Sequence, residues 1–438
     1  MKDFALIQAI PKESEKSVFR LWQSTYNRRF RGQKFHFILS WIVRLIVIML
    51  ANSSWATEQG AISTLQTYLN RSLTSATIQK LPGMTNENYL ISESNGDQYV
   101  IRIPGFATSH FIDRSSENRN SQEAFNFQFT PTGPLYFNLA EGTKITKYIT
   151  NVENLKFEDF YRLEMIEKIV SLLRDIHKSP MQFSNEVNIS SRINSITKVL
   201  FDNALNIPPE YYAVKDDIDI LKQLLSSSVF EKVPTHGDPV PGNFIFFEGR
   251  LMLFDWEYSG LNDPAYDLAF LANVMDYPYE LEKMLVTLYK SEYSEMLHAK
   301  LIFFKPFVEF WLGLWGLTQT VARSDVAEKD FFLYFAIARF RKSQKYMQDP
   351  SMAKSLKIIQ QSSLQNLYNK NGQSFFIKVP IAIPLEKYPP LVKFPILCDE
   401  TGFFFATPVQ LGLWICPYCG ILNPSQNTSC LSLNCPNK

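Results

Sequence analysis

The feature that most constrains this chain is the stretch from residue 234 to residue 268. It places His236, Asp238 and Asn243 on one tight loop that is rich in proline and glycine. Two apolar runs around a glycine turn follow the loop, and Asp255 comes just after the second run. This order predicts a polar loop, a pair of strands, and a carboxylate at the end of the second strand.

These residue types suit phosphoryl transfer from a nucleotide. That reaction needs a carboxylate that orients the attacking hydroxyl and accepts its proton, and it needs oxygen ligands for Mg²⁺. Asp238 is the candidate for the first role, with His236 as the second catalytic candidate, and Asn243 and Asp255 are the candidate Mg²⁺ ligands. Such residues are usually solvated loop side chains, but here spacing, order and flanking strands agree. We therefore predict a kinase site.

The spacing H-x-D-x-x-x-x-N, with Asp255 twelve residues after Asn243, resembles the catalytic loop and metal-binding Asp of kinase-like phosphotransferases that act on small alcohols. The sequence Asp-Trp-Glu-Tyr from residue 255 narrows the resemblance to choline and ethanolamine kinases, including their bacterial branch. The resemblance covers about residues 58–342. It implies a two-lobed, protein-kinase-like α+β fold that binds ATP and Mg²⁺ between the lobes. It also implies choline, ethanolamine or a related small amino alcohol as the substrate.

The same resemblance assigns the nucleotide phosphates to residues before the central stretch. Gly83, Thr85 and Asn86 resemble the loop that covers the phosphates with backbone amides. Arg102 stands where these folds place the cation that holds the phosphates, and Glu117 resembles the helix carboxylate that pairs with this cation. A glycine turn or a strand Arg alone is more often structural, so the expectation depends on their combination.

Aromatic and acidic residues after Asp255 are expected to shape the amine side of the site. Trp311 and Trp315 are four residues apart and share one helix face. A cation over an aromatic face gains roughly 0.5 to 2 kcal/mol, which suits a quaternary ammonium. The match is incomplete, because Asn273 replaces a family Glu and Leu312 stands at the first family Trp. The expected substrate residues are Glu257, Tyr258, Tyr277, Trp311, Trp315 and Phe335.

Two further residues are expected to have structural roles and not to touch the substrate. Asp267 resembles the Asp that braces the catalytic loop by accepting its backbone amides. His177 ends a helix of apolar residues spaced by three and four, and we expect it to be a packing or capping residue.

The first 57 residues precede the resemblance. Residues 37–51 are almost entirely apolar, but a run of about 15 is shorter than the ~20 that span a bilayer. Arg44 near its centre would cost roughly 2.5 to 3.5 kcal/mol on insertion. We therefore expect an accessory helix in a cytoplasmic protein, and we leave open membrane association through residues 36–51 and a true start at Met49.

All five cysteines lie after residue 397, and four of them form two pairs on short turns. Cys416, Cys419, Cys430 and Cys435 supply the four thiolates that a tetrahedral structural Zn²⁺ requires. The pattern resembles the Ran-binding-protein-2 type of zinc finger, with C-x4-C in place of the last C-x2-C. We expect a structural zinc knuckle, and we leave open whether it also contacts a protein partner.

The charges of the chain are balanced. With 44 Lys and Arg against 43 Asp and Glu, there is no basic field that would favour nucleic acid. Two alternative functions remain. One is an aminoglycoside- or thiamine-type kinase, which Gly237 favours, and the other is an inactive kinase-like scaffold that acts through its zinc knuckle.

The expected domain order follows from all these assignments. The expected domains are an extension (1–57), a small lobe (58–150), a large lobe (151–345), a linker region (346–412) and the zinc finger (413–438).

Overall fold

The computed structural model describes residues 58–371 except 74, 204, 227 and 228, together with the backbone of residues 413–415 and 422–424. The chain separates into two compact units, Met1–Ser63 and Thr64–Lys438. The second unit contains the predicted large lobe and all of the predicted small lobe except residues 58–63. The apolar segment 36–51 and the four cysteines of the expected zinc knuckle lie outside the described residues.

An antiparallel sheet of five strands forms the small lobe, in the order β1-β2-β3-β5-β4. Its central strands bury Ile91 and Ile101 completely, because apolar side chains on one face of a strand pack against the rest of the lobe. Arg102 pairs with Asn88 of β2 on one side and with Lys144 of β5 on the other. The elements are β1 (Thr77–Leu81), β2 (Glu87–Ser92), β3 (Gln98–Ile103), the 3-10 turn η1 (Thr108–His110), α3 (Arg114–Asn126), β4 (Tyr136–Phe137) and β5 (Lys144–Lys147).

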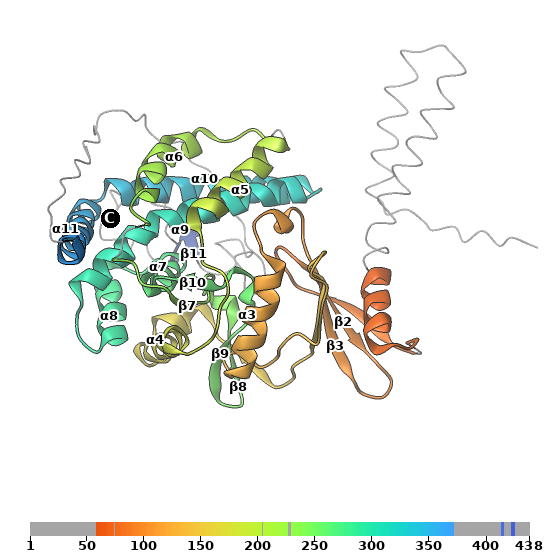
Figure 1. Ribbon diagram of the computed structural model, residues 1–438. Coiled ribbons are helices and arrows are strands. Elements are labelled where there is room, and N and C mark those ends of the chain that lie inside the picture. The colour runs from red at the N-terminus through yellow and green to blue at the C-terminus, as the bar shows by residue number, and fades with distance from the viewer. Residues whose placement is uncertain are drawn as a thin grey trace, which may run out of the picture. The chain divides into compact units, whose positions relative to one another are not determined.

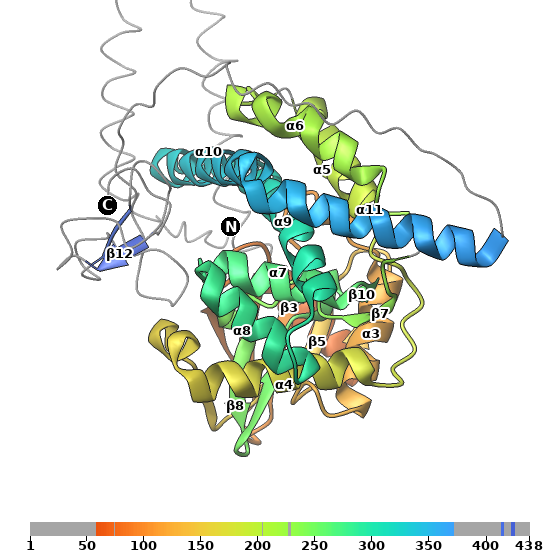
Figure 2. The same cartoon turned by 90° about the vertical axis from the view of Figure 1, so that its left-hand side faces the viewer.

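Helix α9 is the central element of the large lobe, and α5, α6, α7, α8, α10 and α11 all pack against it (Figures 1 and 2). The helices are α4 (Leu163–Lys178), α5 (Ile189–Asp202), α6 (Pro209–Lys222), α7 (Pro264–Val274), α8 (Tyr279–Lys290), α9 (Glu295–Ala322), α10 (Val326–Gln348) and α11 (Pro350–Asn371). Shorter elements are β6 (Val152–Asn154), η2 (Phe157–Tyr161), β7 (Val233–Thr235), η3 (Pro241–Asn243), β8 (Phe244–Phe247), β9 (Arg250–Leu253), η4 (Trp256–Tyr258) and β10 (Gly260–Asn262).

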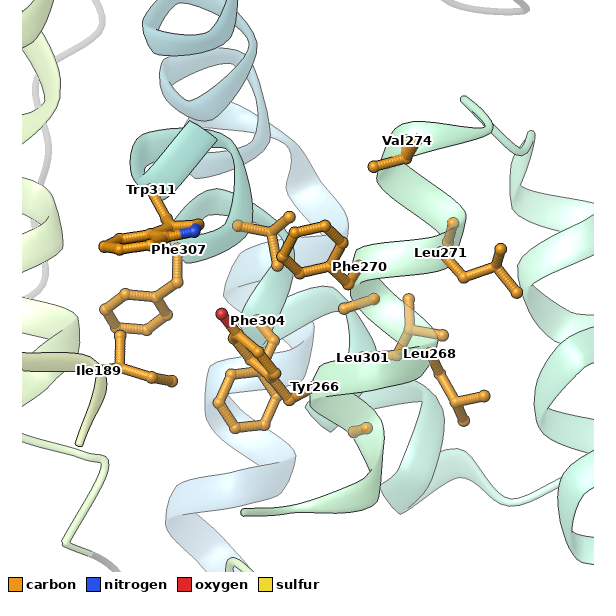
Figure 3. Close-up of a cluster of buried hydrophobic side chains, with 14 of the residues drawn as sticks. Ile189, Tyr266, Leu268, Phe270, Leu271, Val274, Leu301, Phe304, Phe307 and Trp311 are labelled. Atoms are coloured by element: carbon orange, nitrogen blue, oxygen red, sulfur yellow. The ribbon is translucent and has the colours of Figure 1, made fainter. Parts of the chain in front are cut away.

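Aromatic side chains fill the interface between α7 and α9 (Figure 3). The ring of Phe304 meets Tyr266 edge to face, with 5.6 Å between centroids. Phe307 and Trp311 continue the same face of α9, and burying each such side chain stabilises the fold by about 1.5 to 3 kcal/mol. By length and composition α9 could cross a membrane. However, 89% of its most apolar 18-residue stretch is buried within the fold, as in the core helix of a globular protein.

The hairpin of β8 and β9 brings the two predicted Mg²⁺ ligands together. Phe244 pairs with Leu253, so the residues just before β8 and just after β9 lie side by side. Glu248 and Gly249 both have positive φ, of 50° and 74°, as a tight two-residue hairpin turn requires. The predicted strand, turn and strand are therefore confirmed.

The large lobe extends beyond the boundary expected at residue 345. Helix α11 packs on α9 and buries Met352, Leu356 and Ile359. Residues 350–371 are therefore part of the lobe and are not the linker that the sequence suggested. Further along the chain, the short strands β11 (Leu413–Ile415) and β12 (Leu422–Pro424) pair antiparallel.

Candidate active site

The loop after β7 is held by a buried carboxylate. Asp267 on α7 accepts the backbone N–H groups of His236 and Gly237, at 2.8 and 2.9 Å. His177 lies 3.0 Å from the same carboxylate through Nε2, and its Nδ1 lies 3.0 Å from the Tyr289 hydroxyl. Burial alone would raise the pKa of Asp267, but these hydrogen bonds lower it below its usual value. The predicted bracing role of Asp267 is confirmed, and His177 is a buried supporting residue, as expected.

Gly237 is required by close packing inside this loop. It has a φ of +80°, and a β-carbon there would lie 2.2 Å from the carbonyl oxygen of Tyr258. Any other residue would push the loop away from η4. The loop therefore keeps Asp238 close to the segment that carries Asp255 and Tyr258.

His236 is fully buried, and both of its ring nitrogens have partners. Nε2 lies 2.6 Å from the Phe254 carbonyl oxygen, which can only accept, so Nε2 carries the proton. Nδ1 then accepts the backbone N–H of Asp238, at 3.3 Å. Burial lowers the pKa of His236, in agreement with this neutral tautomer. His236 thus connects the loop to the end of β9, and the structure makes it a positioning residue instead of the catalytic group that we expected.

Asp238 lies at the surface of the loop with its side chain half-buried. The Asn243 amide donates to the Asp238 backbone carbonyl at 2.9 Å and to its carboxylate at 3.3 Å. Burial raises the pKa of Asp238 to about 7, helped by the negative charge of Asp255 and opposed by the bond from Asn243. A carboxylate with such a pKa can exchange a proton near neutral pH.

Asp255 has features of a metal ligand. It adopts left-handed backbone angles, φ 59° and ψ 77°, which are uncommon for a residue other than glycine and are often found at functional sites. Its Oδ1 is buried and receives no hydrogen bond from the described residues. The Phe254 N–H donates to the Asn243 carbonyl at 2.8 Å, which fixes the two segments together. The oxygens of Asn243 and Asp255 therefore fit Mg²⁺, which commonly takes one or two protein ligands and completes its shell with phosphates and water.

Arg102 lies in a buried cluster of charges beneath this site. Its guanidinium is 2.5 Å from Glu117 and 3.1 Å from Glu257, and it donates to the Gly142 carbonyl at 2.9 Å. The predicted pair of Arg102 and Glu117 is therefore present. Burial alone would raise the pKa of Glu117, but Arg102, Lys144 and further positive charge hold it well below its usual range.

Glu257 belongs to this cluster and not to the aromatic residues with which we had grouped it. Its Oε2 accepts the Asn86 amide at 3.2 Å, and Asn86 in turn accepts the Gly105 N–H at 3.1 Å. Burial and the neighbouring Asp255 raise the pKa of Glu257, while Arg102 opposes the shift. Glu257 therefore links the predicted phosphate loop, through Asn86, to Arg102.

The aromatic residues expected around the amine fall into three separate groups. Tyr258 packs edge to face against Trp311, with 5.6 Å between centroids. Trp315 packs in the same manner against Phe335, at 5.8 Å. Tyr277 donates its hydroxyl to the Phe160 carbonyl and is buried in the large lobe. Only the group of Tyr258 and Trp311 adjoins the Asp238 loop, through the packing of Tyr258 on Gly237.

Comparison with known proteins agrees with this arrangement. The model of the choline/ethanolamine kinase family matches residues 78–309, which is more than half of the chain and includes the whole catalytic loop and the hairpin. The chain belongs to the choline/ethanolamine kinase family. Among curated members, the protein LicA of Haemophilus influenzae is 29% identical over 194 residues, which make up 43% of this chain and 55% of that protein.

Other family members match over different lengths. Ethanolamine kinase 2 of Mus musculus is 25% identical over 287 residues, or 59% of this chain and 72% of that protein. The crystal structure of the choline kinase LicA from Streptococcus pneumoniae superimposes with a TM-score of 0.54 at 24% identity and covers 67% of this chain and 98% of that one. This likeness confirms the two-lobed kinase-like fold.

Arg192 is a residue of the site that the sequence gave no reason to select. It lies on α5, donates to the Tyr258 carbonyl at 2.8 Å, and sits over the Tyr258 ring at 5.7 Å. It forms no ion pair with any residue that the structure describes, and burial lowers its pKa, with Tyr266, Tyr258 and Asp238 opposing. An arginine on an amphipathic helix carries no signal of function by itself, so only the folded structure places it beside the catalytic loop.

Proposed function

We propose that this chain transfers the terminal phosphoryl group of ATP to the hydroxyl of choline, ethanolamine or a related small amino alcohol. The observation that carries the proposal is the combination of two carboxylates in one site, Asp238 and Asp255. Asp238 is half-buried, and its pKa is raised to about 7. Asp255 has a buried oxygen, Oδ1, that receives no hydrogen bond from the described residues. Asn243 contacts Asp238 through its side chain, and its backbone carbonyl accepts a hydrogen bond from Phe254, the residue before Asp255.

Each residue of the site then has a defined task in the reaction. Asp238 orients the substrate hydroxyl and accepts its proton as the oxygen attacks the phosphorus. Asn243 and Asp255 hold Mg²⁺, which when bound neutralises charge on the phosphates. Arg102, Gly83, Thr85 and Asn86 lie on the nucleotide side, and Glu117 fixes Arg102.

The substrate class is proposed from the family and from the environment of Asp238. The relatives include a choline kinase and an ethanolamine kinase by name. Tyr258 and Trp311 place aromatic surface next to the loop, where a substrate ammonium would gain from the ring electrons. Because the match spans about half the length of the first curated relative, the activity of the whole chain is part of this proposal.

The test is ATP consumption by the purified full chain with Mg²⁺, measured in parallel against choline, ethanolamine, thiamine and kanamycin. We expect turnover with choline or ethanolamine and none with kanamycin. Turnover with kanamycin or thiamine alone would contradict the proposed amino alcohol and would identify a different class of phosphoryl acceptor. MgATP binding without turnover of any of the four would indicate a different alcohol as acceptor, and absence of MgATP binding would favour the scaffold alternative.

The pH dependence of turnover follows from the environment of Asp238. Only the ionised carboxylate can accept a proton, so kcat/KM should fall about tenfold per pH unit below its pKa. Mg²⁺ beside Asp255 would remove a cause of the raised pKa, so the acidic limb should move to lower pH as Mg²⁺ saturates. Rate profiles at low and high Mg²⁺ measure this shift, and a limb that does not respond to Mg²⁺ would contradict it.

The C-terminal cysteines keep their proposed role as a zinc site. Cys416, Cys419, Cys430 and Cys435 offer four thiolates, the ligand set of a structural Zn²⁺. Metal analysis of the purified chain should find one Zn²⁺ per molecule, and Cys416→Ser should release it without loss of kinase turnover. We also propose that the chain works in the cytoplasm, where ATP is supplied, with membrane association through residues 36–51 left to a vesicle-binding assay.

A further inference from the structure

Trp315 contacts the predicted phosphate loop instead of the catalytic loop. Its indole Nε1–H donates to the hydroxyl of Thr85 at 3.1 Å, from α9 of the large lobe to the loop between β1 and β2 of the small lobe. The indole ring also packs nearly perpendicular to the rings of Phe332 and Phe335 of α10, with 5.7 and 5.8 Å between centroids.

A second contact joins the same two segments. Arg323, the residue that follows α9, donates to the backbone carbonyl of Met84, next to Thr85. Its guanidinium lies over the Phe332 ring at 5.4 Å, and its Nε is 3.8 Å from Glu328. Both of these neighbours belong to α10. The end of α9 therefore reaches two consecutive residues of the phosphate loop and is held from behind by α10.

The rest of the loop is fixed from within the small lobe. A β-carbon at Gly105 would lie 1.7 Å from the Thr85 carbonyl oxygen, so β3 and its following residues pass directly against the loop. The Gly105 N–H donates to the Asn86 side chain at 3.1 Å. Met84 and Thr85 are thus attached to the large lobe on one side, and Asn86 to the small lobe on the other. The conformation of the loop depends on both.

We propose that Trp315 and Arg323 are positioning residues for the nucleotide, which hold the phosphate loop in its binding conformation from the large lobe. The inference rests on the proposed role of this loop in binding ATP phosphates. It gives Trp315 a role on the nucleotide side in addition to the substrate role that the sequence suggested. A loop that is already ordered loses less conformational freedom when the nucleotide binds, so these contacts should appear as MgATP affinity.

A double-mutant cycle tests the contact between Trp315 and Thr85. Trp315→Phe removes the indole N–H but keeps an aromatic ring beside Phe332 and Phe335, and Thr85→Val removes the hydroxyl at constant shape. Each should weaken MgATP binding about fivefold, and the double variant should also lose about fivefold, because both changes remove the same bond. Calorimetry without any alcohol measures these affinities, so the result does not depend on which acceptor is used.

Matched variants separate positioning from general damage. Thr85→Ser keeps the hydroxyl and should recover most of the MgATP affinity that Thr85→Val loses. Arg323→Gln should weaken MgATP binding, whereas Glu328→Gln, which removes only a neighbour of Arg323 on α10, should not. Unfolding midpoints of all variants should stay close to that of the wild type.

Three results would overturn the inference. The first is a double variant whose loss of affinity equals the product of the two single losses. The second is a set of single variants with unchanged MgATP affinity. The third is a rise in the KM for the amino alcohol in Trp315→Phe with MgATP affinity unchanged, which would place Trp315 at the amine site alone. Absence of amino alcohol turnover in a chain that passes the cycle would contradict the proposed function but not this inference.

Discussion

Asp238→Asn should lower kcat by roughly 10² to 10⁴-fold, the usual contribution of a general base, with MgATP affinity nearly unchanged. The substitution keeps the size of the side chain. In the wild type the Asn243 amide donates to the Asp238 carboxylate at 3.3 Å, and in the variant it can donate to the new amide oxygen instead. What is lost is the group that takes the hydroxyl proton. Steady-state rates and calorimetric MgATP binding, measured on the same preparation, separate the two effects.

The matched control for this variant is Asp216→Asn, an exposed aspartate on α6 with a side chain 90% accessible. It should change neither rate nor affinity. If Asp238→Asn kept more than about a third of the wild-type kcat, Asp238 would not be the base. The acidic limb of the rate profile would then belong to another group.

Asp267→Ala should produce the largest loss of stability, about 3 kcal/mol or more in the free energy of unfolding. The side chain is completely buried and accepts two backbone N–H groups, from His236 and Gly237. Truncation would leave those donors and His177 without their partner in the interior. Urea unfolding of wild type and variant gives the difference, and turnover should fall with it, because the same bonds hold Asp238.

Asp267→Asn provides an intermediate case, since one amide oxygen can still accept a hydrogen bond. The pKa of Asp267 is lowered in the fold, so its contribution is present above the usual value of about 4 and is lost as pH falls through the lowered pKa. The two variants should therefore differ less from the wild type in acid than at neutral pH. Equal stability of Asp267→Ala and wild type at neutral pH would contradict the bracing role.

The parts of the site that the sequence could predict are those that depend on local chemistry. The loop of Asp238, the hairpin turn at Glu248 and Gly249, and the carboxylate after β9 are set by residues within one short stretch. The bracing role of Asp267 was predicted from the family resemblance, and the structure confirms it with a hydrogen bond from the His236 N–H, 31 residues away. For such segments the pattern of turn residues and apolar runs fixes the geometry.

Other residues were assigned to the wrong neighbours because their partners come from distant segments. Glu257 lies only two residues after Asp255, yet it bonds to Asn86, 171 residues away. Trp315 bonds to Thr85 across 230 residues, and helical spacing says nothing about which lobe a helix end will contact. For α11, which we had placed in the linker region, the local sequence could not reveal that the helix packs on α9.

The most direct test of the whole account is the identity of the phosphorylated product. Phosphorus NMR of the full chain with MgATP and the preferred amino alcohol should show one phosphomonoester formed for each ADP, and none with Asp238→Asn. That result would join the base, the nucleotide and the alcohol in a single reaction. Formation of ADP and inorganic phosphate without the ester would mean that water is the acceptor, and would contradict the assignment of this site to an alcohol kinase.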